Sequence, residues 1–244
     1  MNENDIWAPW YDELHEYNDP TDCVDFLHGL AAPDPVVEFA VGTGRVAIPL
    51  ARRGHRVFGI DISSEMIARL AVKANSNVTG IIADATVVTL PECAGVAYIV
   101  FNSLYALADS NKQELFFCNA YRQMLDGGLL VVEAFVPDHS RAAVCRVHDR
   151  SPTRRTIVST KHNLVSQKID VEVMYLRDNE IHRLFAPTRY IYLSEMDLMA
   201  RMAGFRLVDR FGGWKHEPLN DQGGNAISVF KKVSQPTETQ GRCI

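Results

Sequence analysis

A glycine-rich segment between two apolar runs constrains the fold of this chain more than any other feature. The segment reads E-F-A-V-G-T-G-R-V-A over residues 38–47, with a strand predicted over 36–40 and a helix over 44–53. Gly42 and Gly44 permit positive φ and let a ligand approach the backbone. A glycine turn from strand to helix is typical of nucleotide-binding α/β folds. A tight turn without a ligand is the alternative.

The residues that follow alternate between short apolar runs and helical periods. This alternation predicts a parallel sheet covered by helices on both faces, with right-handed crossovers. Strands are predicted over 56–60, 78–82, 96–101 and 128–134, and helices over 63–74 and 111–125.

Beyond Pro137 the pattern changes. Residues 138–153 show no clear period and predict a loop or a short helix, whereas 154–192 alternate as an antiparallel meander. A helix over 194–203 and strands over 205–211 and 225–231 are predicted to complete the first sheet. We therefore divide the chain into an N-terminal helical cap, a core in two pieces, an antiparallel insertion and a disordered tail. These segments are residues 1–30, 31–137 with 193–232, 138–192 and 233–244.

Composition narrows the class of protein. The chain has 244 residues, of which 47% are hydrophobic and 23% charged, as in globular proteins. Its net charge of −5 argues against nucleic acid as the main partner, and its apolar runs are too short for a membrane span. The start M-N-E-N-D is not a secretory signal. The five cysteines are far apart without a C-x-x-C pair, which predicts neither a disulfide framework nor a metal site and favours the cytoplasm.

Acidic residues end the next two predicted strands. Asp61 lies in F-G-I-D-I-S and Asp84 in I-I-A-D-A. Because parallel strands bring their carboxyl ends to one edge, both acids are expected beside the glycine loop. There Asp61 can accept hydrogen bonds from ribose hydroxyls, and Asp84 can accept from an adenine amine while the Ala85 backbone reaches the ring. Helix capping for Asp61 and a solvated loop position for Asp84 are the alternatives.

With these residues on one edge, the sequence resembles the class I S-adenosylmethionine-dependent methyltransferases. Five segments match their motifs in order, and the resemblance covers residues 30–232. The segments are 38–44, Asp61, Asp84-Ala85, Leu125-Asp126-Gly127-Gly128 and Ala203-Gly204-Phe205. The sequence departs from the family pattern where Ala40 replaces the first glycine, Val41 replaces a small residue and Asp126 replaces a proline.

The resemblance implies a seven-stranded sheet of order 3-2-1-4-5-7-6 with the seventh strand antiparallel, and S-adenosylmethionine as the cofactor. No Walker lysine follows the loop, so nucleotide hydrolysis is not expected. A dinucleotide-dependent oxidoreductase and a non-catalytic binding module on the same fold remain alternatives. The residues expected at the cofactor are Glu38, Gly42, Gly44, Asp61, Ile62, Asp84, Ala85 and Asn102.

The segment after the fourth strand bears on the methyl acceptor. It reads Phe101-Asn102-Ser103-Leu104-Tyr105, without the N-P-P-Y motif of adenine and glutamine methylation or a Pro-Cys nucleophile. This favours a small-molecule or peptide acceptor methylated on oxygen or nitrogen. The chain also resembles small-molecule methyltransferases of secondary metabolism, including amino-sugar N,N-dimethyltransferases. The resemblance lies in a Y-D-x-L helix at residues 11–14 and an Arg189-Tyr190 segment followed by Glu195.

Several side chains are candidates for a base or for acceptor contacts. His139, Glu133 and Tyr11 are the candidate bases, and His139 is favoured because it directly follows the fifth strand. Tyr105, Arg189 and Trp10 are the candidate acceptor contacts. The insertion is expected to roof the acceptor site and to pair two subunits in a homodimer.

Overall fold

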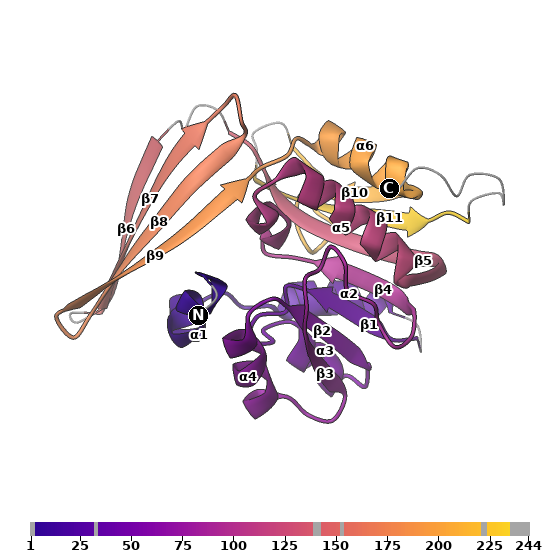
Figure 1. Cartoon of the computed structure of the whole chain (residues 1–244), viewed down its shortest axis with the longest axis horizontal. Helices are drawn as coiled ribbons and strands as arrows, with labels where there is room; N and C mark the ends of the chain where they lie inside the picture. The colour runs from indigo at the N-terminus through magenta and orange to yellow at the C-terminus, as the bar shows by residue number, and fades with distance from the viewer. Residues whose placement is uncertain (1–2, 32–33, 139–142, 152–153, 221–223, 235–244) are drawn as a thin grey trace.

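The computed structural model describes residues 3–31, 34–138, 143–151, 154–220 and 224–234. An α/β core carries a second, antiparallel sheet that extends away from it, and the N-terminal helix α1 lies between the two (Figure 1). His139, the favoured base, lies outside the described residues, as does most of the predicted tail.

The core sheet has seven strands in the order β10-β11-β5-β4-β1-β2-β3, which confirms the expected topology. Strands β1 to β5 are parallel, and β11 is antiparallel to both β5 and β10. The strands are β1 (Val36–Phe39), β2 (Val57–Asp61), β3 (Val78–Ile82), β4 (Ala94–Ile99), β5 (Met124–Val136), β10 (Phe205–Phe211) and β11 (Gly224–Lys232).

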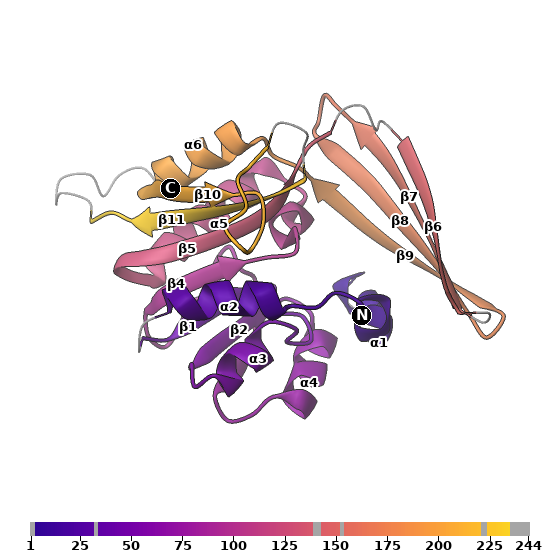
Figure 2. The ribbon, with the colours of Figure 1, turned by 180° about the vertical axis from the view of Figure 1, so that it is seen from behind.

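Helices cover both faces of this sheet, as Figures 1 and 2 show from opposite sides. All four residues of β1 are buried, because side chains on each face meet a helical layer. The helices are η1 (Glu3–Trp7), α1 (Ala8–Leu14), α2 (Thr21–Leu30), α3 (Ala47–Arg52), α4 (Ser64–Lys73), η2 (Ser103–Leu107), α5 (Ser110–Arg122) and α6 (Leu193–Ala203). Hydrophobic side chains of α2, α3 and α4 pack in one cluster and those of α5 and α6 in the other.

The second sheet contains β6 (Ala143–Ser151), β7 (Arg154–Asn163), β8 (Lys168–Arg177) and β9 (Glu180–Arg189), all antiparallel. The meander predicted over 154–192 is confirmed, but the loop or short helix predicted over 138–153 is wrong. Residues 145–148 of β6 are exposed at the edge of the sheet, so no buried face imposes an apolar alternation on this strand. A second difference is that β5 begins at Met124 and includes the predicted turn over 125–128 as an irregularity in register.

A buried hydrogen-bonded cluster joins the end of β9 to the core. The Arg189 guanidinium donates to Gln113 Oε1 at 2.7 Å, to Gln167 Oε1 at 3.1 Å and to Glu195 Oε1 at 2.6 Å. The Gln113 amide donates in turn to the Arg189 carbonyl at 2.8 Å. Nearby, the Tyr105 hydroxyl donates to the carbonyls of Phe135 and Ile191. These bonds fix the direction in which the insertion leaves the core.

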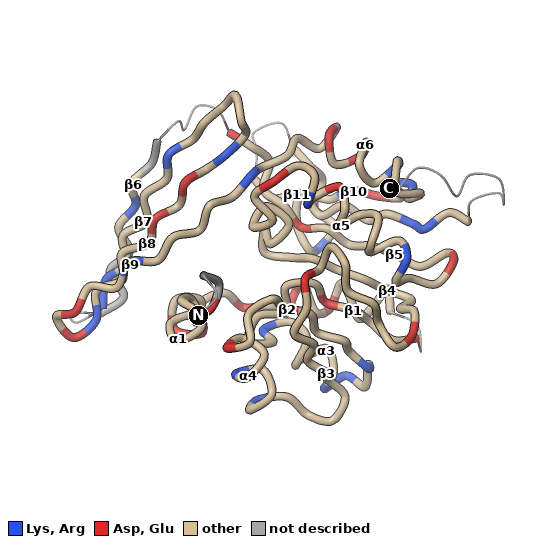
Figure 3. The backbone as a smooth tube through the Cα atoms, viewed as in Figure 1, with Lys and Arg blue, Asp and Glu red and all other residues tan. Residues whose placement is uncertain are grey.

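Helix α1 connects the insertion to the core. On the insertion side, Leu14 packs with Val173, Tyr175 and Leu184 of the second sheet. Glu13 also accepts hydrogen bonds from Arg154 at 2.8 Å and Arg177 at 3.0 Å. Figure 3 shows acidic and basic residues together at this far end of the insertion.

No helix in the described part of the chain is long and apolar enough to cross a membrane. Cys23, Cys93 and Cys145 are free thiols, whereas Cys118 is disulfide-bonded. The widely spaced cysteines therefore do not exclude a disulfide, although they form no framework of several disulfides among the described residues.

The Arg189 cluster predicts a large stability difference between two arginine variants. Arg189→Ala removes the guanidinium from the buried Gln113 oxygen and from the Glu195 carboxylate, which keeps only its bond from Gln167, and we expect a loss of about 3 kcal/mol in the free energy of unfolding. The control Arg183→Ala removes the ion pair of Arg183 with Glu172, in which 61% of the arginine side chain is exposed, and costs less than about 1 kcal/mol. Urea denaturation measures both, and equal losses would contradict the assignment.

Candidate cofactor and acceptor site

The glycine loop follows β1 in a left-handed backbone. Ala40, Gly42 and Gly44 have φ of 59°, 54° and 89°. Ala40 therefore adopts a conformation that glycine would adopt more readily. The cost is roughly 1–2 kcal/mol. Val41 fits next to β2 because Gly59 has no side chain. A Cβ on Gly59 would lie 2.8 Å from Val41 Cγ2.

Asp61 binds the loop to the end of β2. Its Oδ2 accepts the Gly42 N–H at 2.8 Å and its Oδ1 accepts the Ser63 N–H at 2.9 Å. Burial raises the pKa of Asp61, and these backbone donors oppose the shift. The side chain of Ile62 next to it is 45% exposed. The edge therefore presents the Asp61 carboxylate next to the Cβ-free backbone of Gly42, and the apolar side chain of Ile62 follows the carboxylate in sequence.

Asp84 follows β3 on the same edge. Its Oδ1 accepts hydrogen bonds from the Thr86 N–H at 2.8 Å and the Thr86 hydroxyl at 2.7 Å. The Asn119 amide donates to the carbonyl of Ala85 at 3.0 Å and to that of Val88 at 3.1 Å. The backbone after β3 is thereby held by α5, with Asp84 and Ala85 half-buried.

Glu38 and Gly44 have surroundings that differ from those of a ligand contact. The buried Glu38 carboxylate accepts the Tyr98 hydroxyl at 2.9 Å and a bond from the Ala47 N–H, so it supports the start of α3. A Cβ on Gly44 would lie 2.4 Å from Leu70 Cδ1, inside the core. A side chain at Gly44 would therefore damage packing before it reached a ligand.

Helix α1 covers the glycine loop. The Thr43 hydroxyl donates to Asp12, which also accepts the Lys73 ammonium at 2.9 Å. The Tyr11 ring faces Gly42, where an added Cβ would lie 3.7 Å from Tyr11 Cε1. Burial raises the pKa of the Tyr11 hydroxyl, and Arg45 opposes this shift.

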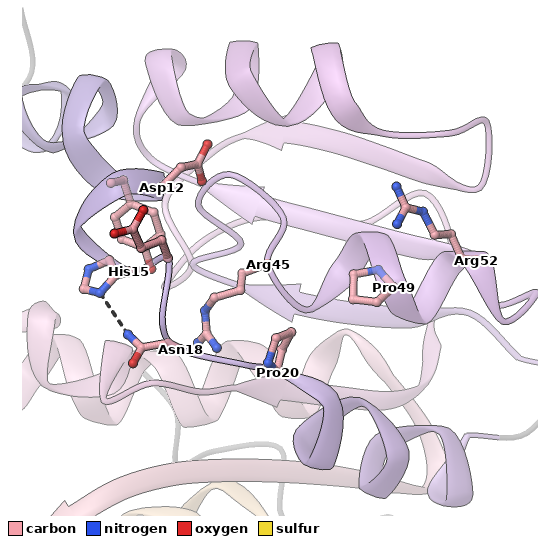
Figure 4. A pocket seen from close by; sticks show the side chains of 9 residues that line it. Asp12, His15, Asn18, Pro20, Arg45, Pro49 and Arg52 are labelled. Carbon is pink, nitrogen blue, oxygen red and sulfur yellow. Dashed lines mark hydrogen bonds between the residues drawn. The ribbon is translucent and has the colours of Figure 1, made fainter. Parts of the chain in front are cut away.

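An aromatic and cationic wall joins α1 to the end of β4. The His15 ring lies 4.6 Å from that of Tyr11 and 5.0 Å from that of Phe101. The Arg45 guanidinium lies 4.5 Å from the centre of the Phe101 ring. A cavity of about 400 Å³ opens beside this wall, between the segment after α1 and helix α3 (Figure 4). Its lining includes Tyr11, His15, Asn18, Arg45 and Arg52.

The turn after β4 is held by β5. Phe101 and Asn102 are both left-handed, with φ of 58° and 61°. The Phe101 N–H donates to Glu133 Oε2 at 2.6 Å, and Asn102 Oδ1 accepts the Phe135 N–H at 2.7 Å. Asn225 also donates to Glu133 Oε1 at 3.0 Å. Both oxygens of Glu133 are thus engaged by the protein itself.

The structure places the three residues expected at the acceptor in different surroundings. Tyr105 is fully buried and Arg189 is 8% exposed, and their polar atoms bind the protein itself. These two residues hold the insertion to the core instead of facing an acceptor. The ring of Trp10 stacks on His182 of the insertion at 4.0 Å. Sequence reasoning missed Arg45 and His15, because no motif marks them and only the fold brings them to Phe101.

Comparisons with known proteins agree with this geometry. The family model described as a methyltransferase domain matches residues 36–128. No curated protein matches the chain in sequence.

Solved structures extend the similarity to most of the chain. The CcbJ methyltransferase from Streptomyces caelestis is 28% identical, with a TM-score of 0.83 over 88% of this chain and 90% of that chain. An S-adenosylmethionine-dependent methyltransferase from Clostridium acetobutylicum is 13% identical, with a TM-score of 0.79 over 93% and 98%. CalS10, an amino pentose methyltransferase from Micromonospora echinaspora, is 16% identical, with a TM-score of 0.69 over 88% and 91%. The chain therefore contains a methyltransferase domain over residues 36–128, and its fold is that of methyltransferases of known structure over most of its length.

The buried Glu38 predicts a pH dependence of stability. Burial raises its pKa from 4.5 to about 8. Between these values the folded chain holds a proton that the unfolded chain releases, so the stabilisation is complete below pH 4.5 and is lost as the pH rises to 8. One such proton changes the free energy of unfolding by up to about 1.4 kcal/mol per pH unit.

Glu38→Gln removes this titration while keeping the side-chain shape. We expect the fall in unfolding free energy between pH 5 and pH 8 to be less steep in the variant than in the unmodified chain. Chemical denaturation at several pH values measures the two slopes, and identical slopes would show that Glu38 ionises normally in the folded state.

Proposed function

We propose that this methyltransferase transfers the methyl group of S-adenosylmethionine to the amino nitrogen of a small-molecule acceptor of secondary metabolism. The observation that carries the cofactor site is the hydrogen bond from the Gly42 N–H to the Asp61 carboxylate, at the edge of the sheet where Asp84 follows β3. Open α/β sheets bind ligands at this edge.

The residues at this edge fit the cofactor. Asp61 would bind the ribose hydroxyls, because its two oxygens offer about four acceptor positions and the backbone N–H groups of Gly42, Ser63 and Ile62 do not fill them all. Ile62 and Ala85 would pack against the adenine ring, and Asp84 would accept its amine. The Arg45 guanidinium, next to Gly44 in the chain, suits the carboxylate at the methionine end.

Other expected cofactor residues would act through the shape of the loop. Glu38 and Gly44 would stabilise the turn through their buried contacts in the core. Gly42 would give the ligand access to the backbone. Asn102 would shape the side of the site next to β4.

S-adenosylmethionine supplies an activated methyl group on a sulfonium. The chain then has to align the acceptor, exclude water and, for a protonated acceptor, remove a proton. Glu133 already accepts hydrogen bonds from two protein donors, and burial raises the pKa of Tyr11. A neutral amine suits such a site, since it needs alignment more than a strong base.

The titles of two structurally similar proteins also favour an amine as the methyl acceptor. CalS10 is an amino pentose methyltransferase, and KedS8 from a Streptoalloteichus species is a sugar N-methyltransferase. If the acceptor is a hydroxyl instead, His139 is the candidate base, because the raised pKa of Tyr11 keeps the Tyr11 hydroxyl protonated.

The proposed cofactor site predicts a selective loss of binding in Asp61→Ala. The unmodified chain should bind S-adenosylhomocysteine in calorimetry and give no heat with nicotinamide dinucleotides. Asp61→Ala should lower S-adenosylhomocysteine affinity tenfold or more, because charge-assisted hydrogen bonds are worth roughly 1.5–3 kcal/mol. Asp178→Ala, at an exposed turn of the insertion, serves as the control. Unchanged affinity in a folded Asp61→Ala protein would overturn the assignment.

We also propose that the outer face of the insertion pairs two copies of the chain. Val147, Ile181 and Phe185 are 55%, 66% and 59% exposed and lie on the same face of the sheet. Exposed apolar patches of this kind mark contact surfaces. Light scattering should give the mass of a dimer for the unmodified chain and of a monomer for Phe185→Asp. A strictly monomeric unmodified chain at high concentration would contradict this pairing.

A further inference from the structure

Glu133 is a buried acid whose carboxylate is surrounded by donors. It is 6% exposed and accepts the Phe101 N–H at 2.6 Å and the Asn225 amide at 3.0 Å. The Trp214 side chain lies against the same carboxylate, where it opposes the rise in the pKa of Glu133 that burial causes. An acid whose two oxygens each accept a hydrogen bond from the protein is suited to hold structure in place.

What Glu133 holds is a strained turn. Phe101 and Asn102 are consecutive non-glycine residues in the left-handed region, which side chains other than hydrogen disfavour. Such a turn persists only where its surroundings fix it. Glu133 fixes the amide of Phe101, and the backbone of Phe135 fixes the side chain of Asn102.

The turn at Phe101 positions the aromatic and cationic wall next to the glycine loop. The Phe101 ring contacts both Arg45 and His15. Arg45 directly follows Gly44 of the glycine loop. A displacement of Phe101 would therefore change the support of Arg45 at the proposed carboxylate contact.

The contact with Trp214 connects Glu133 to a distant segment. Trp214 lies between β10 and β11, and its ring contacts Phe26 of α2 at 5.4 Å. Phe26 also contacts Phe211 at 5.8 Å. Lys215, the next residue, forms an ion pair with Asp22 of α2 at 2.9 Å. The segment that carries Trp214 is thus anchored on α2, on the side of the sheet where Glu133 points.

We propose that Glu133 is a positioning residue, which uses the anchored Trp214 to hold the turn at Phe101 and thereby the Arg45 side of the cofactor site. The inference rests on the proposed function for the role of Arg45. It replaces the candidate role of Glu133 as a base. A base would need a carboxylate oxygen directed at the acceptor, whereas Glu133 is only 6% exposed and its oxygens face the Phe101 amide and Asn225.

The test compares Glu133→Gln, Glu133→Ala and Trp214→Phe with the unmodified chain and with Glu92→Gln, an exposed acid paired with Arg56, as control. Hydrogen exchange of the Phe101 amide reports on the turn, and exchange of the Val131 amide in central β5 reports on global stability. Calorimetry with S-adenosylhomocysteine reports on the cofactor site.

We expect Phe101 exchange, relative to Val131, to rise tenfold or more in Glu133→Ala and less in Glu133→Gln, which keeps one acceptor oxygen. Trp214→Phe, which keeps an aromatic ring but loses the donor, should raise it severalfold. S-adenosylhomocysteine affinity should fall severalfold in Glu133→Ala and recover in Glu133→Gln.

Two results would overturn the inference. One is unchanged Phe101 exchange in Glu133→Ala and Trp214→Phe. The other is equal loss of affinity in Glu133→Ala and Glu133→Gln. If the unmodified chain binds no S-adenosylhomocysteine, the proposed cofactor site fails, and the exchange data still decide whether Glu133 holds the turn.

Discussion

The hydrogen bond from the Gly42 N–H to the Asp61 carboxylate is the contact on which the site depends. It joins the loop after β1 to the end of β2, and so it fixes the glycine backbone at the edge of the parallel sheet. Helix α1 then closes over the same loop through Asp12 with Thr43 and through the ring of Tyr11. Because α1 also packs on the second sheet, this one edge orients the cap and the insertion together.

Most of the core could be predicted because its strands are buried on both faces and therefore appear as short apolar runs. The ends of β1, β2 and β3 carry the residues that the motifs indicate, so their shared edge followed from topology. The insertion strand β6 was missed because its exposed residues follow no apolar alternation.

Side-chain roles were harder to predict than strands. Tyr105 and Arg189 have the chemistry of acceptor contacts, but tertiary packing buries them and engages their polar atoms. The spacing of Arg189 and Glu195, which suggested a subgroup, corresponds to an ion pair at 2.6 Å. Glu133 was predicted to be a candidate base, yet its neighbours come from the turn after β4, from β11 and from the segment of Trp214. Those neighbours lie 32 or more residues away in sequence, so only the fold brings them together.

A crystal structure of the chain with S-adenosylhomocysteine would test the central claim most directly. The account predicts that the ribose hydroxyls bond to Asp61, that the adenine lies against Ile62 and Ala85, and that the ligand carboxylate meets Arg45. Electron density for the ligand at any other place in the fold, with the edge at Gly42 and Asp61 left empty, would contradict the account.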